Sequence, residues 1–365
     1  MERKIKRNPN IELLRIISMM MVLVLHCLSW GGALDYSSGI QLYVYWWLEA
    51  LAIVAVDVFI LISGYFLVKS NFKAKNVFEV AINGVWIYSV FFTFIAMKID
   101  TQEISWNTLF KACVPILTKK FWFVNSYVLM YILSPFINKL IHSLSKKCFS
   151  MLIVYFVTFF SVRATVFPMT WSQDDTAGMG IIGFVMLYCI GAWIRLYYKR
   201  NGRILKWLCI YLGMSFLLVV SKVGIIMIGA DSLSTKFYSY ASPLVIMEAV
   251  SLFLVFLNKN PMKQGFSNSV NKIAKHSFSV YIIHFSMLNV LFTKIFCINN
   301  YLDNVVTGIL AVVLSVIIIY AVCTVIDIIK CYLFDQFRVF LKDSAIERKY
   351  SEICLKWESQ VNEVY

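Results

Sequence analysis

Long apolar runs alternate with short polar segments along nearly the whole chain of 365 residues. A run of about 20 apolar residues can cross the hydrocarbon core of a bilayer as an α-helix. Ten such runs lie near residues 11–30, 43–68, 77–97, 121–141, 149–168, 178–198, 207–228, 241–257, 276–297 and 304–334. The pattern therefore predicts an all-α polytopic membrane protein with about ten transmembrane helices.

The composition supports this fold class. The residues AVILMFWYC make up 60% of the chain and charged residues only 15%, whereas soluble domains are about 45 to 50% apolar. This balance excludes an ordinary soluble enzyme. No linker rich in Pro, Gly or Ser divides the chain. We therefore expect one transmembrane domain over residues 1–334 and a cytoplasmic C-terminal tail over 335–365.

The net charge of +14 would suggest a nucleic-acid partner in a soluble protein, so the positions of the basic residues matter. Of the 34 Lys and Arg residues, 25 fall on one set of alternate loops and 5 on the other. Cytoplasmic loops carry such an excess. We therefore expect a multi-pass protein of the cell membrane with both termini cytoplasmic. Its basic loops would contact anionic lipid, and no nucleic-acid partner is expected.

A few ionisable side chains fall inside the apolar runs. Each costs on the order of 2.5 to 3.5 kcal/mol in the hydrocarbon region, so each needs a partner, a cavity or a function. They are Glu12, Arg15, His26, Glu49, Asp57, Arg163, Lys222, Glu248, His276, His284 and Asp327.

Arg15 and His26 form the most informative pair. They are 11 residues apart, which places them on one helix face and about 16 Å apart along its axis. A basic anchor in line with a titratable imidazole indicates a site for an elongated anionic substrate. Two simpler interpretations remain open: an arginine near a span end can extend to the headgroups, and a histidine can cap a carbonyl of a neighbouring helix.

Other buried groups have candidate partners. Asp57 falls in the same half of the membrane as Arg15 and could neutralise it, while Glu49 falls near the depth of His26. Tyr281 lies three residues before His284, so these two side chains share a helix face and could hydrogen-bond to each other.

Two further expectations concern residues of later spans and span ends. Lys222 and Glu248 could pair across helices. Trp122 is one of several tryptophans near predicted span ends, where an interfacial aromatic belt is the expected interpretation.

Four segments resemble the acyltransferase 3 family of integral membrane enzymes, which O-acylate surface glycans. The opening run carries Arg15, ten residues and then His26, as the first span of that family does. Residues 56–67, with Ser-Gly-aromatic, resemble the second span. Residues 121–127 with 133–138, and residues 279–284 with Tyr-x-x-His, resemble later segments. The similarity covers about residues 11 to 290.

The resemblance implies transfer of an acyl group, most often acetyl, from cytoplasmic acyl-CoA to a hydroxyl of a surface or lipid-linked polysaccharide. It implies His26 as the catalytic base, with His284 and Asp57 as further catalytic residues. Arg15 would bind the CoA phosphates. Many members carry an Arg-x-x-Arg cluster at the start of the third span, where this chain has Lys69, Lys73 and Lys75. These lysines are the expected donor-binding residues, although lysine lacks the bidentate fork of arginine.

Several alternatives remain open at this point. The same buried residues could form a proton relay in a transporter or flippase for a lipid-linked sugar or lipid. Spacing does not decide whether His26 acts only as a base or briefly carries the acyl group. No C-x-x-C or H-E-x-x-H motif is present, so no metal is expected. A homo-oligomer is compatible with the sequence, which does not determine the oligomeric state.

Overall fold

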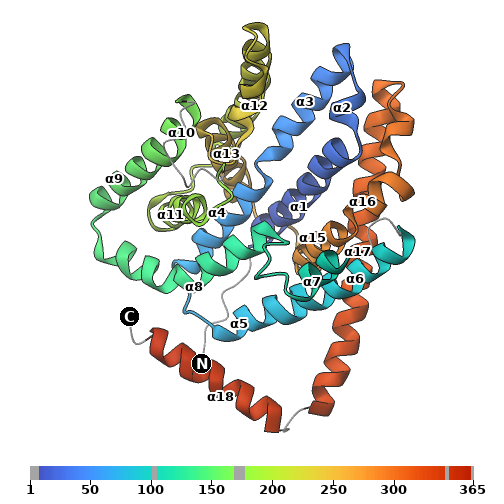
Figure 1. Ribbon diagram of the computed structural model, residues 1–365. Coiled ribbons are helices and arrows are strands. Elements are labelled where there is room, and N and C mark those ends of the chain that lie inside the picture. The colour runs from blue at the N-terminus through green and yellow to red at the C-terminus, as the bar shows by residue number, and fades with distance from the viewer. Residues whose placement is uncertain (1–7, 101–104, 168–176, 342–344, 363–365) are drawn as a thin grey trace.

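The computed structural model describes residues 8–100, 105–167, 177–341 and 345–362. Within these ranges every regular element is a helix (Figure 1). The predicted all-α fold class is therefore confirmed.

The first half of the chain contains the helices α1 to α10 and two π-helices. They are α1 (Pro9–Trp30), α2 (Ala33–Tyr36), α3 (Gly39–Ile53), α4 (Ala55–Leu67), α5 (Ala74–Phe78), the π-helix η1 (Glu79–Trp86), α6 (Ile87–Ile99), α7 (Trp106–Cys113), α8 (Trp122–Ser143), α9 (Lys146–Val157), the π-helix η3 (Thr158–Val162) and α10 (Arg163–Val166).

The second half of the chain ends in the longest helix, α17, and an amphipathic helix, α18. Its elements are α11 (Ile181–Tyr197), α12 (Ile204–Met227), η4 (Asp231–Leu233), η5 (Lys236–Tyr238), α13 (Pro243–Asn258), α14 (Gln264–Ala274), α15 (Ser277–Ser286), α16 (Leu288–Val290), the π-helix η6 (Leu291–Ile295), η7 (Ile298–Tyr301), α17 (Val305–Leu341) and α18 (Ala345–Asn362).

Helices occupy all ten predicted runs, but not all of them are simple spans. Among the described residues, seven helical stretches are long and apolar enough to cross a membrane. The run at 276–297 is instead bent by 80° between Ser286 and Leu288, and α11 has only 17 residues. Polar residues dilute the apolar character of α8. The multi-pass architecture therefore stands, while the number of crossings and the side of each terminus stay predictions.

The first helix lies at the centre of the bundle. It contacts α3, α4, α13, α14, α15 and α17, and Figure 1 shows it surrounded by these elements. Ile11, Leu14 and Leu23 are fully buried in these contacts. Because so many elements pack on α1, its polar side chains face other helices rather than lipid.

Helices α4 and α11 pack closely because two glycines let their backbones approach each other. A Cβ atom added at Gly64 would overlap the carbonyl oxygen of Tyr188, and one added at Gly191 would overlap that of Leu61. This contact fixes the orientation of α4, which forms part of the wall of the cavity described below.

The C-terminal residues fold back onto the start of the third span. The helix α17 continues without a break across residues 334 and 335 to Leu341, so the predicted division of the chain falls inside a helix. Beyond it, α18 packs against α5 (Figure 1). The rings of Phe72 and Trp357 lie 5.3 Å apart and those of Phe78 and Tyr350 5.8 Å apart. The assignment of residues 335–365 as a cytoplasmic tail stays a prediction.

We expect Gly191→Ala to destabilise the protein, because the added methyl group forces α4 and α11 apart and such overpacking costs about 1 to 3 kcal/mol. The measurement is the thermal unfolding midpoint in detergent. Gly213→Ala in α12 is the matched control, since nothing lies within 4 Å of a Cβ added there. Equal midpoints for the two variants would contradict the role of this contact.

Candidate active site

An elongated cavity of about 460 Å³ runs along the central helix. Arg15 and His26 both line it, so the shared helix face predicted from their spacing is confirmed. Six residues of α1 line the cavity from one end to the other: Arg15, Met19, Val22, Leu25, His26 and Ser29.

A matching stripe comes from α3 and α4, which together run as one stretch. Its lining residues are Glu49, Ile53, Val56, Phe59 and Ser63. The short connection 31–38 reverses the chain after α1, so the two stripes run antiparallel. Each covers 14 residue steps, or about 21 Å of helix. Arg15 therefore lies at the same end of the cavity as Ser63, and Ser29 at the same end as Glu49.

The remaining walls come from α8, α15, η1 and the segments that precede α13 and α15. They contribute Trp122, Phe123, Tyr127, Tyr281, Phe278, Val80, Tyr240 and Lys275, among others. Trp122 therefore lines an internal cavity and packs its ring 5.6 Å from that of Tyr240. Its place in an interfacial belt stays a prediction.

His26 forms a hydrogen bond with His284, which the sequence did not indicate. The Nδ1 atom of His26 lies 2.8 Å from the Nε2 atom of His284. The Nδ1 atom of His284 lies 2.7 Å from the carbonyl oxygen of Val280. His284 is fully buried in α15, one turn after that carbonyl. Two of the residues predicted to be catalytic are thus brought together from opposite ends of the chain.

These two bonds determine which nitrogen atom of His26 is the base. A carbonyl oxygen only accepts hydrogen bonds, so the Nδ1 atom of His284 carries the proton and donates it to Val280. The Nε2 atom of a neutral His284 is then an acceptor, and the Nδ1–H group of His26 donates to it. The Nε2 atom of His26 consequently keeps its lone pair. His26 is held in the tautomer that a general base requires.

Asp57 does not join this arrangement. Its side chain is fully buried, and within the described residues neither carboxylate oxygen has a hydrogen-bond partner. It is absent from the lining of the cavity. The expected ion pair with Arg15 does not form, because the carboxylate nearest the Arg15 Nε atom is that of Glu12, at 3.9 Å. A catalytic role for Asp57 stays a prediction.

Two other expected pairs are also replaced. The hydroxyl group of Tyr281 has no hydrogen-bond partner among the described residues, so it does not bond to His284. The ammonium group of Lys222 lies 3.1 Å from the Glu49 carboxylate and does not pair with Glu248. Both corrections concern contacts between helices, which helical periodicity does not determine.

The three lysines expected to bind the donor lie outside the cavity. Lys69, Lys73 and Lys75 are exposed, and none of them lines the cavity. The ammonium group of Lys75 lies 3.9 Å from the Glu79 carboxylate. At the Arg15 end, the basic side chains that line the cavity are Arg15 itself, whose side chain is 33% exposed, and Lys275.

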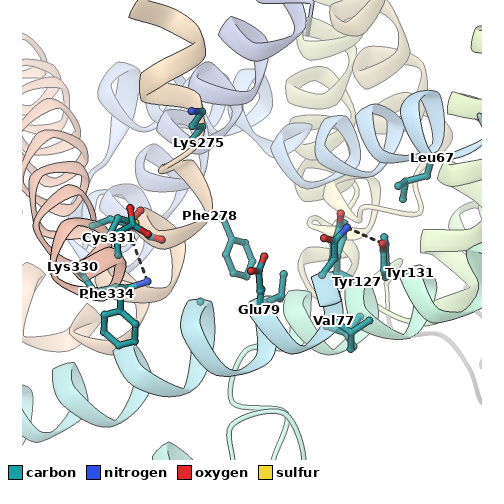
Figure 2. A pocket seen from close by; sticks show the side chains of 17 residues that line it. Leu67, Val77, Glu79, Tyr127, Tyr131, Lys275, Phe278, Lys330, Cys331 and Phe334 are labelled. Carbon is teal, nitrogen blue, oxygen red and sulfur yellow. Dashed lines mark hydrogen bonds and ion pairs between the residues drawn. The ribbon is translucent and has the colours of Figure 1, made fainter. Parts of the chain in front are cut away.

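A second cavity, which we call the vestibule, adjoins this end. It has a volume of about 540 Å³ and shares Val80, Tyr127, Lys275 and Phe278 with the first cavity. Figure 2 shows Lys330, Cys331 and Phe334 on one side of it and Tyr127 and Tyr131 on the other, with Phe278 and Glu79 between them. The shared residues make the two cavities neighbours.

Asp327 in α17 anchors one wall of the vestibule. It lies 2.6 Å from the Nδ1 atom of His276, accepts a hydrogen bond from Tyr88, and lies 3.7 Å from the Lys330 ammonium group. These bonds hold α15, α6 and α17 together. His276 is one of the ionisable residues of the apolar runs, and its partner is 51 residues away in the sequence.

His276, Asp327 and Cys331 are the one group of metal-ligating side chains that the described residues bring together, with ligand atoms within 4.8 Å of one another. Both carboxylate oxygens of Asp327 already bind other groups, and the Lys330 ammonium would repel a metal ion there. These contacts favour a structural hydrogen-bond cluster over a metal site.

The comparisons with known proteins agree with this geometry. A family model described as an acyltransferase domain matches residues 8–327. The chain belongs to the acyltransferase 3 family. No curated protein and no solved structure matches it. The protein is thus a membrane acyltransferase, and the cavity that holds Arg15 and His26 is the candidate active site.

We expect His284→Phe to lower the rate of acyl transfer by about 100-fold, within the range that a positioned base contributes. Phenylalanine fills a similar volume but offers no acceptor to the Nδ1–H group of His26. The measurement is kcat, with the KM for the acyl donor expected to stay unchanged. His142→Phe is the matched control, because His142 contacts the carbonyl oxygen of Val68 and does not line the cavity. An unchanged rate in His284→Phe would refute the role of the histidine pair.

Proposed function

We propose that this acyltransferase is an O-acyltransferase that moves an acyl group, most simply acetyl, from cytoplasmic acyl-CoA to a hydroxyl of a surface or lipid-linked polysaccharide. The observation that carries the proposal is the single elongated cavity with Arg15 at one end and the base of His26 farther along it. A cavity of this form can accept a long thioester at one end and a hydroxyl at the other.

The donor would enter from the vestibule. Lys275 lines both cavities and Arg15 lines the first, and their charges suit the phosphate groups of CoA. The rise of about 16 Å between Arg15 and His26 matches an extended pantetheine arm. The thioester would reach His26 while the nucleotide stays in the vestibule. The excess of basic residues on one set of loops supports a cytoplasmic position for this end.

The chemical step follows from the tautomer of His26. Its Nε2 atom takes the proton of the acceptor hydroxyl while that oxygen attacks the thioester carbonyl carbon. The tetrahedral intermediate then breaks its C–S bond. The CoA thiolate leaves and takes the proton from the Nε2 atom of His26, which restores the neutral pair. His284 accepts the Nδ1–H hydrogen bond throughout and stabilises the imidazolium form of His26.

We expect His26→Gln to abolish acyl transfer, with a loss of at least about 100-fold, because glutamine has no basic nitrogen. The assay follows labelled acetyl-CoA into polysaccharide and into free CoA. His142→Gln, which changes a histidine outside the cavity, is the control for expression and folding. Transfer at the normal rate by His26→Gln would rule out the proposed mechanism.

Arg15→Gln tests the donor path. We expect the KM for acetyl-CoA to rise at least about tenfold, as loss of a charge-assisted phosphate contact predicts, with the KM for the acceptor unchanged. The comparison variant replaces Lys69, Lys73 and Lys75 together by Gln. Because these lysines are exposed, we propose that they attract the donor at long range. Their effect should be smaller and should vanish at high salt.

An unchanged KM for acetyl-CoA in Arg15→Gln would contradict the role of Arg15 in donor binding. A larger, salt-independent effect of the triple lysine variant would contradict donor entry through the vestibule. Either result can be read without knowing the acceptor, since release of free CoA reports the donor side alone.

A further inference from the structure

The cavity continues past His26 to an end whose lining differs from the rest. Ser29 and Glu49 lie there, one from each antiparallel stripe. Most of the residues between the two ends of these stripes are apolar. A carboxylate beyond the base, on the side away from Arg15, cannot serve the phosphates of CoA, because like charges repel. This end must therefore contact a part of the reactants other than the phosphates of CoA.

A contact with a residue outside the cavity lining holds Glu49 in place. Its Oε2 atom lies 3.1 Å from the Nζ atom of Lys222. That ammonium group lies over the rings of Trp46 and Tyr238, at 4.9 and 4.7 Å from their centroids. Lys222 is 7% exposed and does not line the cavity. The cavity therefore presents the carboxylate and not the ammonium, and the second oxygen of Glu49 can accept hydrogen bonds from a ligand.

Aromatic side chains also line this cavity. Trp122 is one of them, and its ring lies 5.6 Å from that of Tyr240, another lining residue, at an angle of 32°. An oriented carboxylate and flat ring faces together suit a ligand with hydroxyl groups at its rim and C–H groups on its faces.

We infer that this end of the cavity is an acceptor subsite for an uncharged sugar ring, and that Glu49 selects against acidic sugars. The inference rests on the proposed function. A neutral or N-acetylated pyranose would donate a hydroxyl to Glu49 and present another hydroxyl to His26. A uronic acid would bring a second carboxylate to Glu49 in a water-poor site, where a like-charge contact is strongly unfavourable.

The test compares two acceptors that differ only at C6, a methyl hexopyranoside and the corresponding methyl hexuronide. Purified protein in lipid nanodiscs receives labelled acetyl-CoA, and each sugar is measured both as an acceptor and as a competitive inhibitor of CoA release. We expect the neutral sugar to act with a kcat/KM, or an inverse inhibition constant, at least about tenfold greater than that of the uronide.

Glu49→Gln should reduce this ratio toward unity, because the amide keeps an acceptor oxygen and loses the charge. Glu49→Gln alone leaves the buried Lys222 charge without its partner, which can destabilise the protein. A double variant, Glu49→Gln with Lys222→Met, removes both charges and avoids this effect. Glu248→Gln is the matched control: Glu248 is fully buried but does not line the cavity. We expect it to keep the wild-type ratio.

The inference is overturned if the wild type treats the two sugars alike, if neither sugar is acylated or inhibits, or if the ratio survives in both Glu49 variants. These results differ from failure of the proposed function. In that case the wild type would release no free CoA from acetyl-CoA in a His26-dependent way, whatever sugar is present.

Discussion

The hydrogen bond between His26 and His284 is the interaction on which the active site depends. It joins α1 to α15 across 258 residues of sequence. It also transmits the constraint of a backbone carbonyl, since Val280 fixes the protonated nitrogen of His284 and His284 in turn fixes that of His26. A helical carbonyl is a rigid reference for an imidazole ring, so the tautomer is set by the fold and not by solvent. This orientation of His26 therefore needs no carboxylate partner.

Buried ion pairs and polar clusters hold the walls around this bond. The contact between Glu49 and Lys222 joins α3 to α12, and the contacts of Asp327 join α17 to α15 and α6. Both lie at an end of the path that leads to His26. In a membrane such groups stay charged only when paired, so each pair also determines which helices can be neighbours. The same contacts that stabilise these buried groups thereby hold the walls of the cavities in place.

Much of the candidate site could be predicted from sequence because it lies on one helix. The common face of Arg15 and His26 follows from 3.6 residues per turn, and all-α membrane architecture follows from the length of the apolar runs. The contacts between side chains of different helices could not be predicted from the sequence. Lys222 meets Glu49 in place of Glu248, and His284 bonds with His26 and not with Tyr281. Periodicity gives the direction of a side chain but not the rotation or neighbour of the opposing helix.

The sequence by itself determined the fold class, the family and the line of residues along α1, because local helix geometry and hydrophobicity act within one segment. Only the tertiary structure decided which nitrogen atom of His26 is basic, that Trp122 faces an internal cavity, and that the cavity ends at the carboxylate of Glu49. Those properties depend on packing between helices far apart in the chain. They are fixed where buried polar groups find partners, which no single segment can specify.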